Sequence, residues 1–335
     1  MDLKKLLCEL CEADGMGGLG GALSVAEKYL SEFSDVRRSG NSLIASIKGN
    51  GKRKILLDAH IDEIGMMVTS IDGSFVKVAA AGGIDYRMLA AMRVKIHGKS
   101  IVNGVFCSVP PHLTKDETSA PNFDELYIDT GLKNASDIIS IGDRVTFMQS
   151  FKELHNGYVT AKSLDNRSGV AALIYCAYLL KDKEIPCNVD ILLSDMEELG
   201  GDGAKVEAYS IYPDEAIVVD VSFGNAPDIP NEKTGVMAGG TMIGVSPILS
   251  ENITNKLINI AKNKGLEYQL EVIGGRTSTN ADVVTVTRSG VPCALASIPL
   301  RNMHTPVEIV NMNDIETTAK ILSEYILSSA KEDNI

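Results

Sequence analysis

Short apolar runs of strand length alternate with helical patterns from Gly169 onward, and this alternation constrains the fold more than any other feature of the chain. Such alternation indicates an α/β fold, in which helices cover both faces of a parallel or mixed sheet. Residues 282–288 suit either a strand or a crossover helix, and we choose the helix. In chain order, the expected elements lie at 170–180 (helix), 189–193 (strand), 216–220 (strand), 252–264 (helix), 268–272 (strand), 282–288 (helix), 292–297 (strand) and 313–329 (helix).

The N-terminal segment contributes further helices and strands. Residues 2–33 have a helical pattern with a glycine-rich break at 15–21. Strands are expected at 42–48 and 55–58, and Gly49-Asn50-Gly51 between them is typical of a hairpin turn.

Residues 66 to 158 have a different character from the rest. Short β-rich runs are separated by Gly, Pro and Asp, and no long helix is expected. This pattern predicts a small β-barrel module. We therefore expect one α/β domain made of residues 1–66 and 160–335, with a β-barrel domain at 67–159 inserted into it.

Charge and cysteine usage exclude several functions. A net charge of −12 over 335 residues disfavours nucleic acid or an anionic membrane as partner, because both require concentrated Lys and Arg. No run approaches 18 consecutive apolar residues, so no membrane span is expected. The six cysteines lack the spacing of a disulfide framework, and the pair Cys8 and Cys11 has no second pair with which to bind zinc. A reducing, cytoplasmic setting is the expectation.

Side chains that can bind metals recur at the ends of the apolar runs. In open α/β sheets, ligands bind at the C-terminal ends of the strands. Adjacent carboxylates that emerge from a buried strand need a cation or a shared proton to offset their repulsion. A His-x-Asp spacing also places a carboxylate where it can orient a ligating imidazole. The candidates are His60 with Asp62, Asp165, the pair Glu197 and Glu198, Asp220, and His304.

Each candidate also has an ordinary explanation when it is taken alone. Asp165 could cap a helix, His304 could be a solvated loop histidine, and Glu197 with Glu198 could form a solvated acidic turn. Taken together, the residues suit two divalent ions, because imidazole and carboxylate ligands bind zinc and one carboxylate can bridge two metals. Such a set leaves room for a bridging water.

Several stretches, in order along almost the entire chain, carry a resemblance to a known family. They read DAHIDEIG at 58–65, GGIDYRML at 82–89, SVPPHL at 108–113, ELYIDTG at 125–131, SLDNRSG at 163–169, MEELGGDGA at 196–204, VVDVS at 218–222 and RNMHTPVE at 301–308. With these stretches the chain resembles the tetrahedral aminopeptidase family of dinuclear metallopeptidases, whose members include glutamyl and deblocking aminopeptidases and some proteins once labelled endoglucanases. The resemblance implies a phosphorylase/hydrolase-like α/β domain with an inserted β-barrel domain.

The resemblance also implies a role for each candidate residue. His60, Asp165 and Asp220 would bind one metal, and Asp165, Glu198 and His304 the other, with Asp165 as the bridge. Asp62 would orient His60, and Glu197 would be the general base that takes a proton from the metal-activated water. The implied activity is removal of N-terminal residues from short peptides with two divalent ions, zinc or cobalt. The implied assembly is a homo-oligomer, often a dodecamer.

Two departures from the family pattern bear on specificity. Asn280 stands where an Asp is usual, which is expected to alter recognition of the first substrate residue, and Thr241 stands where a Pro is usual. Neither is an expected metal ligand.

Two other functions remain open on the sequence alone. The same two-metal chemistry could deacylate N-acyl amino acids or small amides, and a silent metal-binding scaffold would need the ligands without the hydrolysis. A glycosidase would need two opposed carboxylates and no metal, which disfavours that reading.

Overall fold

The larger part of the chain is built around a mixed sheet. The computed structural model describes residues 1–113 and 121–329. Most neighbouring strands near the centre of this sheet are parallel, as the alternation of strands and helices predicts. The sheet has eight strands, in the order β1 (Asp35–Ser39), β2 (Ser42–Ile47), β12 (Asn188–Ser194), β3 (Lys54–His60), β13 (Glu215–Phe223), β16 (Cys293–Leu300), β14 (Thr241–Val245) and β15 (Tyr268–Val272).

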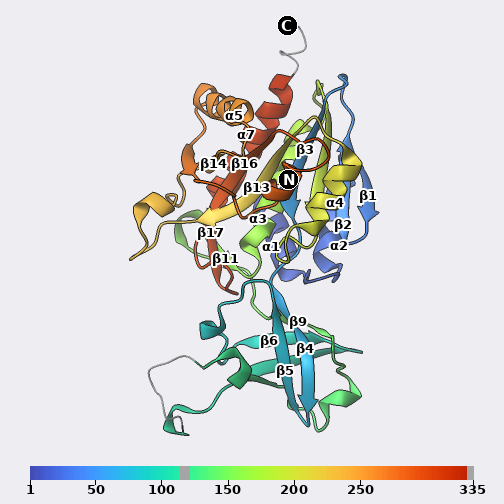
Figure 1. The fold of residues 1–335 in the computed structure, drawn as a ribbon, viewed down its shortest axis with the longest axis vertical. Helices are drawn as coiled ribbons and strands as arrows, with labels where there is room; N and C mark the ends of the chain where they lie inside the picture. The colour runs from blue at the N-terminus through green and yellow to red at the C-terminus, as the bar shows by residue number, and fades with distance from the viewer. Residues whose placement is uncertain (114–120, 330–335) are drawn as a thin grey trace.

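Helices cover both faces of this sheet, which confirms the expected fold class (Figure 1). Neighbouring side chains of a strand point to opposite faces, so Leu57 joins one apolar cluster while Leu56 joins the other. The first cluster contains α1 (Leu3–Glu12), α2 (Gly21–Leu30), α3 (Leu164–Leu180), α5 (Glu251–Lys264) and α7 (Met312–Ser328), and the second contains α4 (Asp202–Ile211) and α6 (Ala281–Val284).

In the part of the chain that the structure describes, no helix combines the length and the hydropathy that crossing a bilayer requires.

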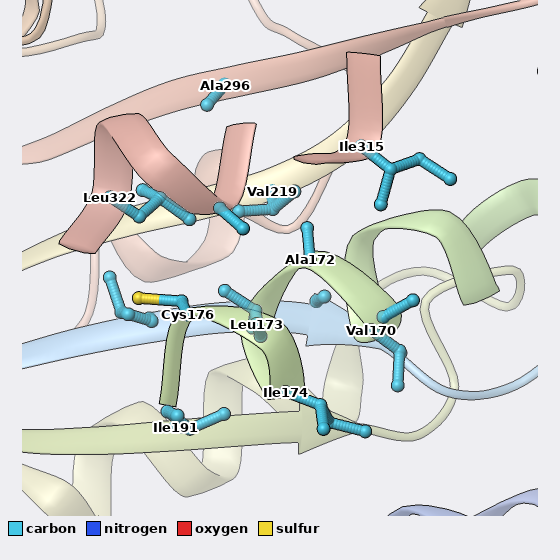
Figure 2. Packing of buried hydrophobic residues seen from close by; sticks show 14 of the residues in the cluster. Val170, Ala172, Leu173, Ile174, Cys176, Ile191, Val219, Ala296, Ile315 and Leu322 are labelled. Atoms are coloured by element: carbon cyan, nitrogen blue, oxygen red, sulfur yellow. The ribbon is translucent and has the colours of Figure 1, made fainter. Parts of the chain in front are cut away.

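Helix α3 lies at the centre of the core. It is apolar on all sides, which is the pattern of a helix surrounded by protein. Figure 2 shows Leu173 and its neighbours facing strand residues such as Ile191 and Val219, while Leu322 of α7 lies above them. Burial of each large aliphatic side chain contributes about 1.5–3 kcal/mol. The N-terminus of α3 is therefore held rigidly against the sheet.

A closed barrel forms a separate body below the sheet (Figure 1). Along one of its strands Val102 and Phe106 point inward into the barrel's own apolar cluster, while Ile101 and Val105 point outward. Closure gives each of these strands a neighbour on both sides. In barrel order the strands are β4 (Gly65–Asp72), β5 (Phe75–Ala81), β8 (Tyr127–Asp129), β7 (Ile101–Cys107), β6 (Arg93–His97) and β9 (Arg144–Phe147).

A small antiparallel sheet connects the barrel segment back to the larger body. It consists of β10 (Lys152–Glu153), β11 (Tyr158–Ala161) and β17 (Glu308–Asn311). Neither β11 nor β17 was expected from the sequence, because each is only four residues long and lacks a clear alternating pattern.

The expected hairpin between the strands at 42–48 and 55–58 is wrong. Strand β12 lies between β2 and β3, antiparallel to the first and parallel to the second. The glycines allow close approach to another part of the backbone instead of forming a hairpin turn. A Cβ on Gly49 would lie 2.0 Å from the carbonyl oxygen of Cys187. The loop thus passes against residues 185–187. The actual hairpin pairs β1 with β2 through Gly40, whose φ of +56° suits glycine.

Two further boundaries differ from expectation. The helix expected at 282–288 exists but is shorter, running from Ala281 to Val284. Strand β13 continues to Phe223, so Asp220 lies inside the strand rather than at its end. Helix α4 and strand β14 were not expected, because glycines interrupt the pattern of both segments.

Candidate metal centre

Three strands and the loops after them place candidate residues at one end of the sheet. His60 is the last residue of β3, and Glu197 and Glu198 follow β12, which is parallel to β3. Asp220 lies near the end of β13, which is parallel to β3 on its other side. Because these strands run in the same direction, their C-terminal ends bring the side chains together.

Asp165 lies between two imidazoles. Its Oδ1 is 3.1 Å from Nε2 of His60, and its Oδ2 is 3.6 Å from Nε2 of His304. Asp165 stands at the start of α3, where its φ and ψ are not helical, so its side chain points to the sheet edge instead of along the helix. This carboxylate can therefore serve two separate groups of ligands at once.

Each of the two imidazoles also has a second carboxylate nearby. Oδ1 of Asp220 lies 3.7 Å from Nε2 of His60, and Oε2 of Glu198 lies 3.5 Å from Nε2 of His304. Tetrahedral coordination with bonds of about 2 Å separates ligand atoms by about 3.3 Å, close to these distances. His60, Asp165 and Glu198 also present ligand atoms within 4.8 Å of one another, a group that could hold a metal ion. Nitrogen and oxygen ligands in these positions fit zinc-type divalent ions.

Asp62 holds other residues of the site in position. Its Oδ1 lies 3.3 Å from Nδ1 of His60, on the side of the ring that faces away from Asp165. Its carboxylate also accepts hydrogen bonds of 3.2 Å from the backbone N–H groups of Glu197 and Glu198. One buried side chain thus orients an imidazole and fixes the turn that carries both glutamates.

Glu308 is a supporting residue that the sequence reasoning missed. This buried carboxylate accepts a hydrogen bond of 3.0 Å from the backbone N–H of Asp165 and one of 2.9 Å from that of His304. His304 has a φ of +62°, which is uncommon for a residue with a side chain, and the bond to Glu308 holds it there. The only sequence signal was its place in the stretch RNMHTPVE, since no helical or strand period links these residues.

Gly83 is the second supporting residue that was missed. Its carbonyl oxygen lies 2.8 Å from Nδ1 of His304. A carbonyl oxygen can only accept, so Nδ1 donates and Nε2 keeps the lone pair that a metal ligand requires. Gly83 belongs to the segment between barrel strands β5 and β6, so the barrel segment reaches the site.

The substitution Gly83→Ala tests this contact. The new Cβ would lie 2.7 Å from Nδ1 of His304, so the imidazole must move and lose its bond to the carbonyl. We expect kcat/KM for a peptide substrate to fall about 10- to 100-fold, as is usual when the partner of a ligating histidine is lost. Gly275→Ala is the control, since its Cβ would meet nothing within 4 Å. Equal activity of both variants would contradict the role of Gly83.

Burial and crowding shift the ionisation of these groups. Burial, together with the charge of Asp165, raises the pKa of Glu198 to about 9. Burial raises the pKa of Asp220 well above its usual range, although the nearby His60 opposes the shift. Burial alone would lower the pKa of His60, but hydrogen bonds to Asp165 and Asp62 raise it well above its usual value. Such crowded carboxylates are relieved by positive charge, which divalent ions supply.

A cavity of about 890 Å³ opens onto these residues. His60, Asp165, Glu198, Asp220 and His304 all line it. Glu197 lines it too, and its Oε2 lies 4.0 Å from Nε2 of His60. Burial raises the pKa of Glu197, with the charge of Asp165 adding to the effect. The cavity is large enough for the end of a peptide.

Asn280 does not line this cavity. It is buried, and its amide donates hydrogen bonds of 2.9 Å to Oδ2 of Asp58 and to Oγ of Ser194. Any influence on the first substrate residue is therefore indirect, because neighbours such as Thr279 line the cavity instead. Thr241 is also buried, and its hydroxyl bonds to Thr318 of α7.

Comparison with known proteins shows the family of the chain. The family model described as M42 glutamyl aminopeptidase matches residues 41–321. A putative aminopeptidase from Acetivibrio thermocellus is 36% identical over 93% of this chain and 95% of its own, and the lysyl aminopeptidase from Pyrococcus furiosus is 28% identical over 98% and 97%. The structure of the Pyrococcus horikoshii TET1 peptidase, 28% identical, superposes with a TM-score of 0.86 over 98% of this chain and all of that one. The chain belongs to the M42 glutamyl aminopeptidase family, which is a family of peptidases.

Proposed function

We propose that this protein is a metal-dependent aminopeptidase that releases residues from the free N-terminus of short peptides. The observation that carries the proposal is the carboxylate of Asp165, which faces the imidazoles of His60 and His304 at the edge of a peptide-sized cavity. Family membership supports the peptidase chemistry, and the ligand geometry supports its dependence on metal.

The donor atoms suit two divalent ions per subunit, with zinc or cobalt as the expected ions. His60, Asp165 and Asp220 would hold one ion, and Asp165, Glu198 and His304 the other. When bound, such ions lower the pKa of a water molecule and polarise a scissile carbonyl group. Asp62 and Glu308 keep the ligands in position through the contacts described above.

Glu197 would act as the general base. Its carboxylate faces the cavity close to His60 but is not needed to complete either group of three ligands. From there it can accept a proton from the attacking water and then deliver it to the leaving amine. Because the neighbouring Glu198 is held by the same Asp62, the two glutamates keep a fixed relative position.

The comparisons and the cysteines support further proposals. The TET1 relative assembles into tetrahedral or octahedral shells, and we propose that this chain forms a homo-oligomer, with a dodecamer as the first candidate. All six cysteines are free thiols, which suits a cytoplasmic location. The barrel has an apolar cluster of its own, which supports the proposed inserted domain at 67–159 between residues 1–66 and 160–335, although the first barrel strand already begins at Gly65.

The test uses a matched pair of peptides, one with a free N-terminus and one acetylated. Metal-stripped protein is supplied with zinc or cobalt, and products are separated by chromatography. We expect cleavage of the free peptide only, no cleavage after stripping, and recovery when metal is returned. Cleavage of the blocked peptide would move the assignment to a deacylase, and metal binding without cleavage of either would favour a scaffold.

A further inference from the structure

The floor of the cavity holds a carboxylate that the chemistry proposed above does not use. Glu271 lies on the edge strand β15, and its register partner on β14 is Gly244. Paired residues of neighbouring strands point to the same face, so Glu271 and Gly244 lie on one face of the sheet, and the side chain of Glu271 extends across β14 on that face. There it accepts a hydrogen bond from Ser222 and one of 2.7 Å from Ser297.

These two serines place the carboxylate beside the metal centre. Ser297 is the register partner of Asp220, and Ser222 follows Asp220 by two residues on the same face of β13. Along the strand, Ser222 is therefore about 7 Å from Asp220. A long side chain on the first substrate residue can cover that distance. Glu271, Ser222 and Ser297 all line the cavity.

The carboxylate of Glu271 has free acceptor positions for a cation. Each of its oxygens accepts one hydroxyl, and a carboxylate offers about four acceptor positions. Among residues 1–113 and 121–329, no lysine, arginine or histidine forms an ion pair with it. A partly buried carboxylate that keeps free acceptor positions at a cavity wall is a suitable partner for a ligand ammonium or guanidinium group.

The cavity also offers an apolar path to this carboxylate. Met242 and Leu295 line the cavity next to Ser297, the first as its register partner on β14 and the second two residues before it on β16. Lysine and arginine bury an aliphatic stem along apolar surface while the charged end reaches a polar partner. The apolar side chains of Met242 and Leu295, with the carboxylate of Glu271 beyond them, match the shape of a lysine or arginine side chain.

We propose that Glu271 recognises a cationic side chain on the first residue of the substrate, so that the protein releases N-terminal lysine or arginine in preference to neutral or acidic residues. This inference rests on the aminopeptidase function proposed above. Two cations, Lys233 and Arg276, also line the cavity, but both are exposed. Exposed charges are screened by water and salt, so they select less strongly than a partly buried carboxylate.

The test compares lysyl-, leucyl- and glutamyl-p-nitroanilide as substrates of the metal-loaded enzyme. We expect the lysyl compound to have the highest kcat/KM and the glutamyl compound the lowest. In Glu271→Gln, kcat/KM for the lysyl compound should fall about tenfold or more, while that for the leucyl compound stays nearly unchanged. Glu184→Gln, the same change at an exposed residue outside the cavity lining, is the control and should keep the wild-type preference.

Three outcomes would overturn the inference. A preference for the glutamyl compound would assign the selection to Lys233 and Arg276. An equal loss on all three compounds in Glu271→Gln, with an unchanged melting temperature, would give Glu271 a structural role only. If the metal-loaded wild type hydrolyses none of the compounds, the aminopeptidase proposal itself fails, and this inference fails with it.

Discussion

Glu197→Gln is expected to lower kcat for a peptide substrate by about 10²- to 10⁴-fold, the usual contribution of a general base. The amide has nearly the same shape as the carboxylate but cannot accept the proton. The backbone N–H of Glu197 still bonds to Asp62, so the turn should keep its geometry. Because Glu197 is not needed for either group of three ligands, metal content should stay that of the wild type.

Metal content, measured by mass spectrometry, separates this result from simple loss of the ions. The control is Glu232→Gln, which makes the same change elsewhere in the cavity lining and should keep its turnover. Near-normal turnover in Glu197→Gln would assign the proton transfer to another group. A loss of metal would instead make Glu197 a ligand.

Asp165→Asn is expected to have the second large effect. Both oxygens of Asp165 face an imidazole, and the substitution replaces one of them with an amide nitrogen that cannot bind a metal. We expect fewer than two bound ions per subunit. We also expect kcat/KM to fall by more than about 100-fold, because even the loss of a residue that only orients a metal ligand costs up to about 100-fold.

Asp72→Asn is the control, because Asp72 is exposed at the end of β4 and lies in the barrel. Its metal content and activity should match those of the wild type. If Asp165→Asn kept two ions per subunit and full activity, Asp165 would not be the bridge, and the two-ion arrangement would have to be redrawn.

Both expected results concern residues that the sequence pattern alone indicates as candidates. In the sequence, His60, Asp165, Glu198 and the other candidates follow apolar runs or precede a helical pattern. Parallel strands bring such ends together, so the sequence pattern was sufficient to predict a shared site. The resemblance then implied a role for each residue, and these roles stay predictions until the variants are measured.

The supporting contacts of Glu308 and Gly83 could not be predicted from the sequence, unlike that of Asp62. Glu308 bonds to a backbone group 143 residues away, and Gly83 bonds to a histidine 221 residues away. No local period encodes a contact of that kind, because it depends on how the barrel segment and the last loop pack together. The hairpin expected between β2 and β3 is wrong for the same reason. Strand β12, which is distant in the sequence, lies between them in the sheet.

The sequence by itself determined the fold class, the barrel and the set of candidate ligands, because burial periodicity and strand ends are local properties. The tertiary structure decided strand order, the tautomer of His304 and the surroundings of Asn280 and Glu271. Asn280 was expected near the substrate but lies against Asp58, whereas Glu271 lines the cavity and bonds to Ser222 and Ser297 across β14. Such assignments depend on which side chains meet across distant strands, and only the folded chain brings them together.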